Sequence, residues 1–318
     1  PLRVVHLITG LDTGGAEMML YKLLRASKPI GIDSTVVSLL PGGDLAAPIT
    51  ELGVEIHSLN MHRGGADPGA VIRLIRLLHR LDADLVQSWM YHANLLGALA
   101  APWLGNSPLV FNLRQSTLDA QGSKRSTHLV VRLGAILSRI APRRIICCSE
   151  RVVEIHRALG YRAEIMRMIP NGFELDRFRP DLQARSALRA RLGIDEAVPL
   201  LGLVARYDPQ KDILTLLRAV ARVRAERPDC RLLLCGKDMT ADNAQIGSWL
   251  EQTGLGGAVH LLGPRRDPER VMAALDVLVS SSAYGEGFPN VIGEAMACGV
   301  PCAVTDVGDS DLIVGDTG

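Results

Sequence analysis

The sequence contains few aromatic residues and has almost no charge imbalance. Phe, Trp and Tyr make up only 4% of the 318 residues, whereas apolar residues make up 47%. The core must therefore consist mainly of Leu, Val, Ala and Ile, a composition typical of parallel sheets covered by helices. The net charge of +1 gives no global signal for nucleic-acid binding, so we expect no nucleic-acid partner.

Long apolar segments and paired cysteines are also missing. No apolar run reaches the roughly 18 residues of a membrane span, and the first segment is too short and polar-flanked for a signal peptide. We therefore expect a cytoplasmic protein. No Cys-x-x-Cys spacing occurs, and the cysteines lie in or beside apolar runs, which indicates reduced core thiols rather than zinc ligands or disulfides. They are Cys147, Cys148, Cys230, Cys235, Cys298 and Cys302.

Short apolar runs alternate with longer amphipathic segments along almost the whole chain. This alternation predicts an α/β fold with parallel sheets and helices on both faces. Strands are expected at 3–9, 34–39, 54–59, 85–88, 109–112, 144–148, 200–204, 231–235, 259–261, 277–279, 302–304 and 312–314. Helices are expected at 15–26, 45–52, 68–81, 91–104, 127–140, 150–159, 184–192, 212–225, 243–253, 268–274 and 289–298.

The rhythm of strands and helices restarts in the middle of the chain. Asn171-Gly172 is a strong turn signal, and a polar, proline-containing stretch follows it to Pro180. We therefore predict two doubly wound domains, 1–172 and 173–318. The chain stops soon after the strand-like run 312–314, so we expect the second domain to be truncated and its closing helices to be missing.

The segment 284–296 is the most informative part of the sequence. A glycine-flanked turn that contains Glu286 leads into a helix expected to start at Pro289. Helical spacing places Val291, Ile292, Ala295 and Met296 on one apolar face and Asn290, Gly293, Glu294 and Ala297 on the other. Small and polar residues on this second face would leave room for a ligand. The helix start favours anionic ligands, because its N–H groups are unsatisfied.

Two other loops follow predicted strands and could bind a ligand. Gly14-Gly15 opens the first helix, where phosphate or sugar could approach the backbone closely. The loop lacks the Gly-x-Gly-x-x-Gly spacing of a dinucleotide site, so NAD binding is not expected. In the second half, Arg206 and Lys211 follow strand 200–204, and a planar guanidinium together with a flexible ammonium suits a diphosphate.

Metal binding is not expected from either Asp-x-Asp pair. Asp82 and Asp84 precede their strand, at the wrong end of a parallel sheet for a site. Asp309 and Asp311 have no third carboxylate or histidine close by in the sequence. Both pairs are interpreted as solvated loops, and we predict neither a metal nor another cofactor.

Polar residues beyond two further strands are candidates for the acceptor side of a site. His92 follows the strand 85–88, so it could line the cleft, although a structural role is the favoured interpretation of this histidine. Arg114 and Ser116 follow the strand 109–112 in the same way.

A basic stretch runs from Lys124 to Arg144. It contains six cations and no acid, and it is partly amphipathic. Such a stretch either forms a solvated helix face or contacts an anionic membrane surface. The second interpretation would place the protein peripherally at the inner face of a membrane.

These motifs together resemble the retaining glycosyltransferases of family 4, which have the GT-B fold of two Rossmann-like domains facing across a cleft. The resemblance covers essentially the whole chain. Its most specific element is Glu-x7-Glu, here Glu286 to Glu294. Three further motifs support the resemblance: Gly-Gly-Ala-Glu at 14–17, where the first helix begins, Ile-Pro-Asn-Gly at 169–172, and the pair Arg206 and Lys211.

The resemblance implies roles for individual residues. Arg206 and Lys211 would bind the donor diphosphate, Glu294 the ribose hydroxyls, and Glu286 with the 287–290 backbone the transferred sugar. The loop at Pro264-Arg265 would border the base. The complete predicted donor site is Gly14, Gly15, Arg206, Lys211, Pro264, Arg265, Glu286, Gly287, Phe288, Pro289, Asn290, Val291 and Glu294.

The sequence departs from the family at two places. Many members carry a histidine beside the reacting sugar. This chain has Asn-Leu-Arg-Gln-Ser at the corresponding positions 112–116, so Arg114 or a neighbour would take the role of the histidine. The glycine pair and glutamate often seen after the last strand are Gly308-Asp309 and Leu312 here. Both differences fit a subgroup of the family that resembles the sugar transferases of polysaccharide and lipopolysaccharide synthesis.

The predicted function is metal-independent transfer of a sugar from a nucleotide diphosphate sugar, with UDP or GDP as the nucleotide. The acceptor would be a sugar or a lipid-linked hydroxyl, and the anomeric configuration would be retained. The predicted catalytic residues are Arg206, Lys211, Glu286 and Arg114. The sequence leaves open a non-catalytic partner subunit that binds nucleotide sugar or lipid, and a nucleotide-sugar epimerase on the same fold. A glycosidase that uses the two glutamates would have no need of the diphosphate-binding cations.

Overall fold

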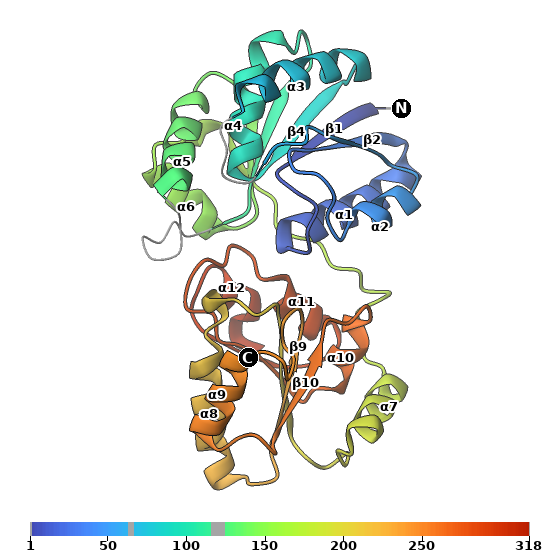
Figure 1. Cartoon of the computed structure of the whole chain (residues 1–318), viewed down its shortest axis with the longest axis vertical. Helices are drawn as coiled ribbons and strands as arrows, with labels where there is room; N and C mark the ends of the chain where they lie inside the picture. The colour runs from blue at the N-terminus through green and yellow to red at the C-terminus, as the bar shows by residue number, and fades with distance from the viewer. Residues whose placement is uncertain (1, 63–66, 116–124, 318) are drawn as a thin grey trace. The chain divides into compact units, whose positions relative to one another are not determined.

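The computed structural model describes residues 2–62, 67–115 and 125–317, and the chain divides into two compact units, Pro1–Asn171 and Gly172–Gly318 (Figure 1). We call them the first and the second unit. In the described residues, no helix is long and apolar enough to cross a membrane.

The first unit contains a seven-stranded parallel sheet in the order β3-β2-β1-β4-β5-β6-β7. In register, Leu2 of β1 lies opposite Ile32 of β2, and Val4 lies opposite Leu85 of β4. The strands are β1 (Leu2–Ile8), β2 (Ile32–Ser38), β3 (Glu55–Ser58), β4 (Leu85–Trp89), β5 (Leu109–Leu113), β6 (Pro142–Cys147) and β7 (Met166–Met168).

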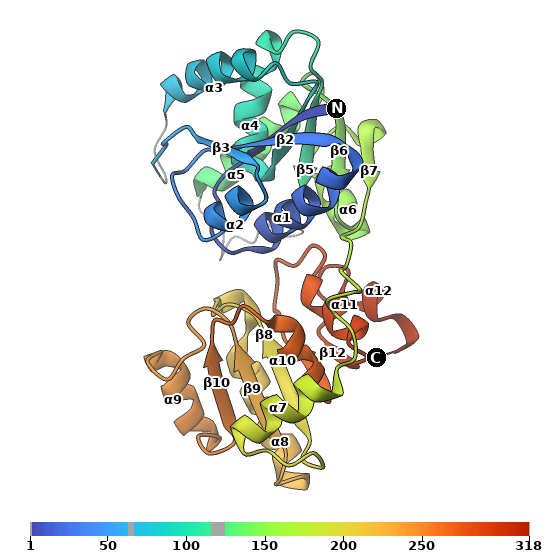
Figure 2. The same cartoon turned by 90° about the vertical axis from the view of Figure 1, so that its right-hand side faces the viewer.

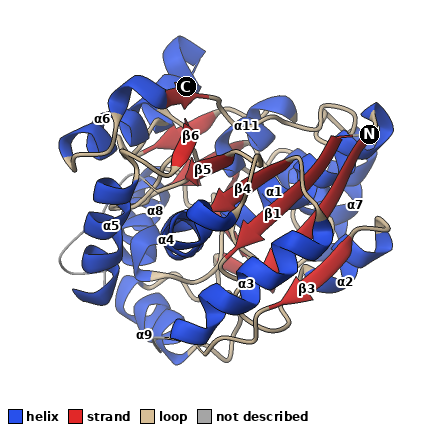
Figure 3. Cartoon of the chain, turned by 90° about the horizontal axis from the view of Figure 1, so that it is seen from above, coloured by secondary structure: helices blue, strands red, loops and turns tan. Residues whose placement is uncertain are grey.

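Helices cover both faces of this sheet. Figure 1 shows α1 and α2 on one side and α3, α4 and α5 on the other. The bounds are α1 (Gly15–Ser27), α2 (Ala46–Glu51), α3 (Pro68–Leu81), α4 (Met90–Ala100), α5 (Arg125–Leu137) and α6 (Glu150–Ala158). Short 3₁₀ turns occupy Lys28–Ile30, Ala101–Trp103 and Ala163–Ile165. Figure 3 shows the strands side by side between the helices.

The second unit contains a five-stranded parallel sheet in the order β10-β9-β8-β11-β12. Its strands are β8 (Leu200–Val204), β9 (Arg231–Cys235), β10 (Val259–Gly263), β11 (Val277–Ser280) and β12 (Cys302–Val304). Its helices are α7 (Leu182–Leu192), α8 (Ile213–Glu226), α9 (Ala244–Thr253), α10 (Pro268–Ala274), α11 (Asn290–Ala297) and α12 (Ser310–Val314), with 3₁₀ turns at Pro209–Lys211 and Gly315–Thr317. Figure 2 shows β10, β9 and β8 beside one another.

Each face of the second sheet has its own apolar core. Leu216 and Leu217 of α8 pack with Ile246 of α9 on one face, whereas Met272 of α10 and Ile292 of α11 pack on the other. These side chains are almost fully buried. The predicted α/β class with two parallel-sheet domains is therefore confirmed.

The predicted bounds agree with most elements to within two or three residues, but some predictions are wrong. Residues 312–314 were predicted as a strand and lie in α12, where Ile313 N–H donates to Asp309 O at 2.9 Å. A helix here places Val314 in the core and Ile313 partly against it, whereas Leu312 is exposed. The strand β7 was not predicted, because its three residues are mostly exposed and lack an apolar run.

All six cysteines are buried and unpaired, as predicted. Burial raises the pKa of Cys302 and of Cys298 to about 11, so these thiols stay protonated at neutral pH.

A buried ion network joins α7 to the amino ends of β8 and β11. The side chain of Arg189 is 1% exposed, and its Nη2 lies 2.6 Å from Asp276 Oδ2. Arg189 also donates to three or more backbone carbonyls, among them Val198 O at 2.9 Å and Ala274 O at 3.1 Å. Asp276 accepts from the backbone N–H of Leu200 at 2.7 Å and from Arg185 at 2.8 Å. A buried charge of this kind is tolerated because its hydrogen bonds are satisfied.

Two histidines are buried in the first unit as neutral rings. The indole N–H of Trp89 donates to Nδ1 of His6 at 3.3 Å. In His156, Nδ1 donates to Val152 O at 2.7 Å, so Nε2 accepts from the hydroxyl of Tyr91 at 2.8 Å. Burial lowers the pKa of both histidines to about 4.

The protein should lose stability between pH 7 and pH 5. Each buried histidine resists protonation when folded and takes up a proton freely when unfolded, so its contribution is full above pH 6.5 and falls toward pH 4. We expect a loss of about 1–2 kcal/mol per histidine at pH 5, measured by urea unfolding. Equal or greater stability at pH 5 than at pH 7 would contradict this assignment.

Candidate functional site

The strand order of the second sheet reverses between β8 and β11, which gives a topological switch point at its carboxyl edge. From β8 the chain winds outward to β9 and β10, whereas β11, the other neighbour of β8, leads to β12 on the opposite side. The loops after β8 and β11 therefore diverge at this point, and open α/β sheets bind ligands at such switch points. Arg206 and Lys211 lie in the first of these loops and Glu286 in the second.

Each of the two cations predicted to bind diphosphate contacts a carboxylate in this structure. Arg206 forms a fork with Asp208, with Nε and Nη2 at 3.1 and 2.9 Å from Oδ2. The other carboxylate oxygen of Asp208 accepts from the backbone N–H of Gln210 at 3.0 Å. Asp208 thus orients the guanidinium and caps the 3₁₀ turn that carries Lys211.

The ammonium of Lys211 forms a short contact with Glu286 Oε1, which also accepts from the hydroxyl of Ser282 at 2.7 Å. Both charged side chains are largely buried, at 16% and 11% exposed. The structure therefore brings together two residues that lie 75 positions apart in the sequence. Partial burial strengthens their attraction relative to a surface pair.

Main-chain hydrogen bonds hold the two loops against each other. Ala283 N–H donates to Gln210 O at 2.8 Å, and the hydroxyl of Ser281 donates to Lys211 O at 2.7 Å. The loop after β12 supports Glu286 from another side, because Asp309 N–H donates to Gly287 O at 3.1 Å. Gly308 permits this approach: its φ is +69°, and a Cβ there would lie 2.5 Å from Glu286 O.

Helix α11 follows directly after this loop. Ile292 and Ala295 are fully buried, with Val291 and Met296 partly buried against the same core, as the predicted apolar face requires. The helix begins at Asn290, so Pro289 is its N-cap and not its first residue. Pro289 has extended backbone at ψ 104°, which places it just outside the helix.

The opposite face of α11 is not open along its whole length. A Cβ at Gly293 would lie 2.1 Å from Phe173 Cζ, so the ring of Phe173 covers the glycine and ligand cannot reach it there. Phe173 also packs against Phe288, with ring centroids 6.1 Å apart. The predicted ligand-facing side is therefore reduced to the first turn at Asn290 and to Glu294, which is partly exposed.

The loop after β10 carries the two residues predicted to border a base. Pro264 is exposed, and Arg265 forms a fork with Asp267 at 2.8 and 2.6 Å. Gly263 O accepts from Gly236 N–H at 2.9 Å, which ties this loop to the one after β9. Their role toward a base stays a prediction.

At the carboxyl edge of the first sheet, Gly14 and Gly15 open α1. Gly14 is the N-cap in an extended conformation, and the carboxylate of Glu17 lies where a Cβ on Gly14 would point. Gly15 is exposed, with no atom within 4 Å of the position a Cβ would take. The backbone at Gly15 is thus open to solvent, and its role toward a ligand stays a prediction.

Arg114 lies at the end of β5 and has partners that the sequence did not indicate. Its guanidinium lies over the ring of Trp89, 4.9 Å from the centroid, and forms a short hydrogen bond to the side chain of Asn171. Burial lowers the pKa of Arg114, although a guanidinium stays protonated at neutral pH.

The remaining acceptor-side candidates are less informative. His92 lies on α4 with an exposed side chain, and its role toward an acceptor stays a prediction. Ser116 lies outside the described residues. Within the described ranges, no group of three or more His, Cys, Asp or Glu side chains is arranged to hold a metal ion.

Sequence reasoning missed several residues that shape the site. Asp208 and Ser282 hold the charged side chains, and Phe173 covers Gly293. Asp208 carried a usable signal, because Asp-Pro before a cation is typical of a capped turn. Ser282 and Phe173 carried none, since their contacts depend on the packing of distant loops.

Comparison with known proteins identifies the family and the fold. The sequence profile "Glycosyltransferase Family 4" matches residues 13–177, and the profile "Glycosyl transferases group 1" matches residues 198–318. Among solved structures, Anabaena Alr3699/HepE in complex with UDP superposes with a TM-score of 0.82 at 24% identity, over 96% of this chain and 81% of that one. This similarity shows a shared fold.

Curated relatives also match by sequence, and two of them show the range. An Escherichia coli UDP-Gal:alpha-D-GlcNAc-diphosphoundecaprenol alpha-1,3-galactosyltransferase is 26% identical over 78% of this chain and 64% of its own length. A D-inositol 3-phosphate glycosyltransferase of Mycobacterium sp. (strain JLS) is 34% identical over 53% of this chain and 37% of its own. The chain thus spans less than two thirds of either relative. With one family profile covering more than half of its residues and two parallel-sheet α/β units of the predicted GT-B type, the chain belongs to glycosyltransferase family 4.

Proposed function

We propose that this protein transfers a sugar from a nucleotide diphosphate sugar to an acceptor hydroxyl. The observation that carries the proposal is the cluster of Arg206, Lys211 and Glu286 at the switch point between β8 and β11, next to the start of α11. The membership of family 4 supports it. UDP is the favoured nucleotide, because one similar structure contains UDP and one relative is named for UDP-galactose.

The two cations suit the charge that develops on a diphosphate leaving group. In this structure they contact Asp208 and Glu286, and we propose that the donor diphosphate replaces these carboxylates. Arg206 and Lys211 would then stabilise the departing diphosphate as a preorganised positive site. The N–H groups at the start of α11 add to this field. The proposal requires neither a metal nor another cofactor.

Release of Lys211 leaves Glu286 available for the sugar. We propose that Glu286 then accepts hydrogen bonds from sugar hydroxyls, while Glu294 holds the ribose. Retention of the anomeric configuration is part of this proposal and is supported by the resemblance to the retaining enzymes. The acceptor would be a sugar or lipid-linked hydroxyl in polysaccharide or glycolipid synthesis, with the protein in the cytoplasm or peripherally on a membrane through 124–144.

The two cations should recognise the diphosphate and not the nucleoside. We expect Arg206→Ala and Lys211→Ala each to weaken UDP binding by about 10-fold to 100-fold, as the loss of a hydrogen bond to a charged group does. Uridine binding should hardly change. Calorimetry with UDP and with uridine measures both, and equal losses for the two ligands would contradict the assignment.

The two glutamates should respond in opposite directions to free nucleotide. Glu294→Gln removes a ribose contact, so it should weaken UDP and UDP-sugar by about 10-fold or more. Glu286→Gln removes the carboxylate that competes for Lys211, so free UDP should bind more tightly while turnover falls. Calorimetry with UDP and a donor-consumption assay measure these effects. Weaker UDP binding by Glu286→Gln would show that Glu286 does not compete for Lys211.

Activity should not depend on a divalent metal. Arg206 and Lys211 already supply the positive charge that Mg²⁺ or Mn²⁺ would bring to the diphosphate. With the correct donor, turnover should therefore persist in excess EDTA. A loss of turnover that manganese or magnesium restores would overturn this prediction.

A further inference from the structure

The guanidinium of Arg114 carries a charge that no carboxylate of the described residues neutralises. It lies over the ring of Trp89, and its Nη1 donates to the side-chain oxygen of Asn171. The titratable groups that face it are the thiols of Cys147 and Cys148. Burial raises the pKa of Cys147 to about 12, so this thiol is neutral and cannot serve as a counter-ion. A half-buried charge without a counter-ion is unfavourable for the folded state.

Two arginines of the second unit show the arrangement that Arg114 lacks. Each holds a carboxylate through the edge that carries Nε and Nη2: Arg206 contacts Asp208 at 3.1 and 2.9 Å, and Arg265 contacts Asp267 at 2.8 and 2.6 Å. In Arg114 the Nη1 end is engaged, whereas Nε is buried and has no acceptor among the described residues. The Nε edge of Arg114 is therefore suited to an anion that this unit does not itself supply.

A second buried polar side chain without partners precedes Arg114 on the same strand. Asn112 is fully buried, and neither its side-chain oxygen nor its side-chain nitrogen has a hydrogen-bond partner in the described part of the chain. Trp89 lies opposite Asn112 in the register of β4 and β5, so the two side chains share a face of the sheet. The contact between Arg114 and Trp89 places the guanidinium on that face as well. Orphaned buried polar atoms are rare in folded proteins, and several at one place indicate a functional site.

The backbone beside these side chains is strained. Met90 follows Trp89 directly and has a φ of +70°, in the left-handed region that bulky side chains seldom adopt. Such strain is concentrated at active sites and ligand-binding sites. The residues concerned lie at the carboxyl edge of the first sheet, which is the edge where open α/β sheets bind ligands.

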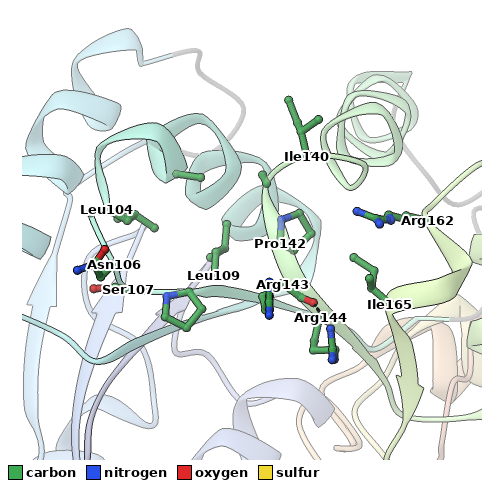
Figure 4. A pocket seen from close by; sticks show the side chains of 14 residues that line it. Leu104, Asn106, Ser107, Leu109, Ile140, Pro142, Arg143, Arg144, Arg162 and Ile165 are labelled. Atoms are coloured by element: carbon green, nitrogen blue, oxygen red, sulfur yellow. Dashed lines mark hydrogen bonds between the residues drawn. The ribbon is translucent and has the colours of Figure 1, made fainter.

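Arginines also line a hollow at the opposite edge of this sheet, but they are held differently. The hollow has a volume of about 430 Å³ and lies beside the amino ends of β5 and β6, with Arg143, Arg144 and Arg162 among its lining residues (Figure 4). These three arginines are exposed, so water solvates their charges and no ligand is needed to stabilise them. They provide a comparison for Arg114 within the same unit.

We infer that Arg114 binds an oxyanion, a phosphate or a carboxylate, on the acceptor substrate. The inference rests on the proposed function, in which Arg206, Lys211 and the start of α11 already bind the donor diphosphate. A cation on the other unit is then free to serve the acceptor. Its Nε edge fits an anion with two oxygens, and Trp89 and Asn171 hold the guanidinium in place.

This inference narrows the acceptor to a hydroxyl compound that also carries a phosphate or a carboxylate. It differs from the role that the resemblance implies for Arg114, because a neutral transferred sugar needs no counter-charge. The anion would supply the partner that the buried Nε lacks.

Calorimetry with three related compounds tests the chemistry. Glycerol 3-phosphate, glycerate and glycerol share a three-carbon skeleton and carry a phosphate, a carboxylate or neither. Excess UDP is present, so that the donor site is occupied. We expect at least one of the two anions to bind and glycerol not to bind, and the tighter anion identifies the group. Binding of none of the three, or equal binding of all three, would overturn the inference.

A matched pair of variants locates the binding. Arg114→Gln should weaken binding of the anion by about 10-fold to 100-fold, as the loss of a hydrogen bond to a charged group does. Arg144→Gln removes an exposed charge at the hollow of the same unit and should have little effect. Equal losses in the two variants would show that general positive charge attracts the anion. The affinity for UDP should be unchanged in Arg114→Gln, and weaker UDP binding would assign Arg114 to the donor instead.

Stability separates a binding role from a structural one. Removal of a charge without a counter-ion should leave the free energy of unfolding unchanged or raise it, whereas removal of a structural arginine would lower it. Urea unfolding of the protein and of Arg114→Gln measures this difference. Lower stability together with unchanged anion binding would overturn the inference.

The same titrations distinguish this failure from a failure of the proposed function. If UDP does not bind the unsubstituted protein, the assignment of the donor site is wrong. Glycerol 3-phosphate titrated without UDP still reports on Arg114 in that case, because only the binding that Arg114→Gln removes is counted.

Discussion

The candidate site depends on the adjacency of β8 and β11. These parallel neighbours come from parts of the chain more than 70 residues apart, and the chain continues from them toward opposite edges of the sheet. Their following loops therefore meet at one point, where Ser281, Ala283, Gln210 and Lys211 are joined by hydrogen bonds. Because the loops are held by main-chain contacts, the charged side chains can exchange partners while the loops stay in place.

This arrangement also explains why ion pairs are present in a site that we propose binds an anion. A buried ammonium without a partner is costly, so a ligand-free site needs a carboxylate near Lys211. Glu286 fills that role, and the hydroxyl of Ser282 keeps its carboxylate oriented when the partner changes. The same logic applies to Arg206 and Asp208, although this pair is more exposed and hence weaker.

Much of the fold could be predicted from the sequence, since buried parallel strands are apolar runs and their covering helices show a clear period. The bounds of β8, β9, α3 and α10 match the predicted ones. Short elements gave less signal. Residues 312–314 read equally well as a strand or as one turn of helix, and only packing against the core decides between them.

The proximity of Lys211 and Glu286 could be predicted, because both follow strands of one parallel sheet and such strands bring their carboxyl ends to the same edge. Features that depend on long-range packing could not. The glycine at 293 indicated open space for a ligand, whereas it makes room for the ring of Phe173. Likewise, the exposure of His92 depends on how α4 packs on the sheet, which the local sequence pattern does not specify.

The two ends of β8 and β11 differ in how their charges are held, and this difference has an evolutionary consequence. At the amino ends, Asp276 accepts from Arg185, Arg189 and the backbone of Leu200 at once, so a substitution of Asp276 removes all three contacts together. At the carboxyl ends, each cation contacts one carboxylate through side chains on loops. Mutation can therefore change the loop residues, and with them the choice of ligand, while the contacts of Asp276 continue to hold β8 and β11 together.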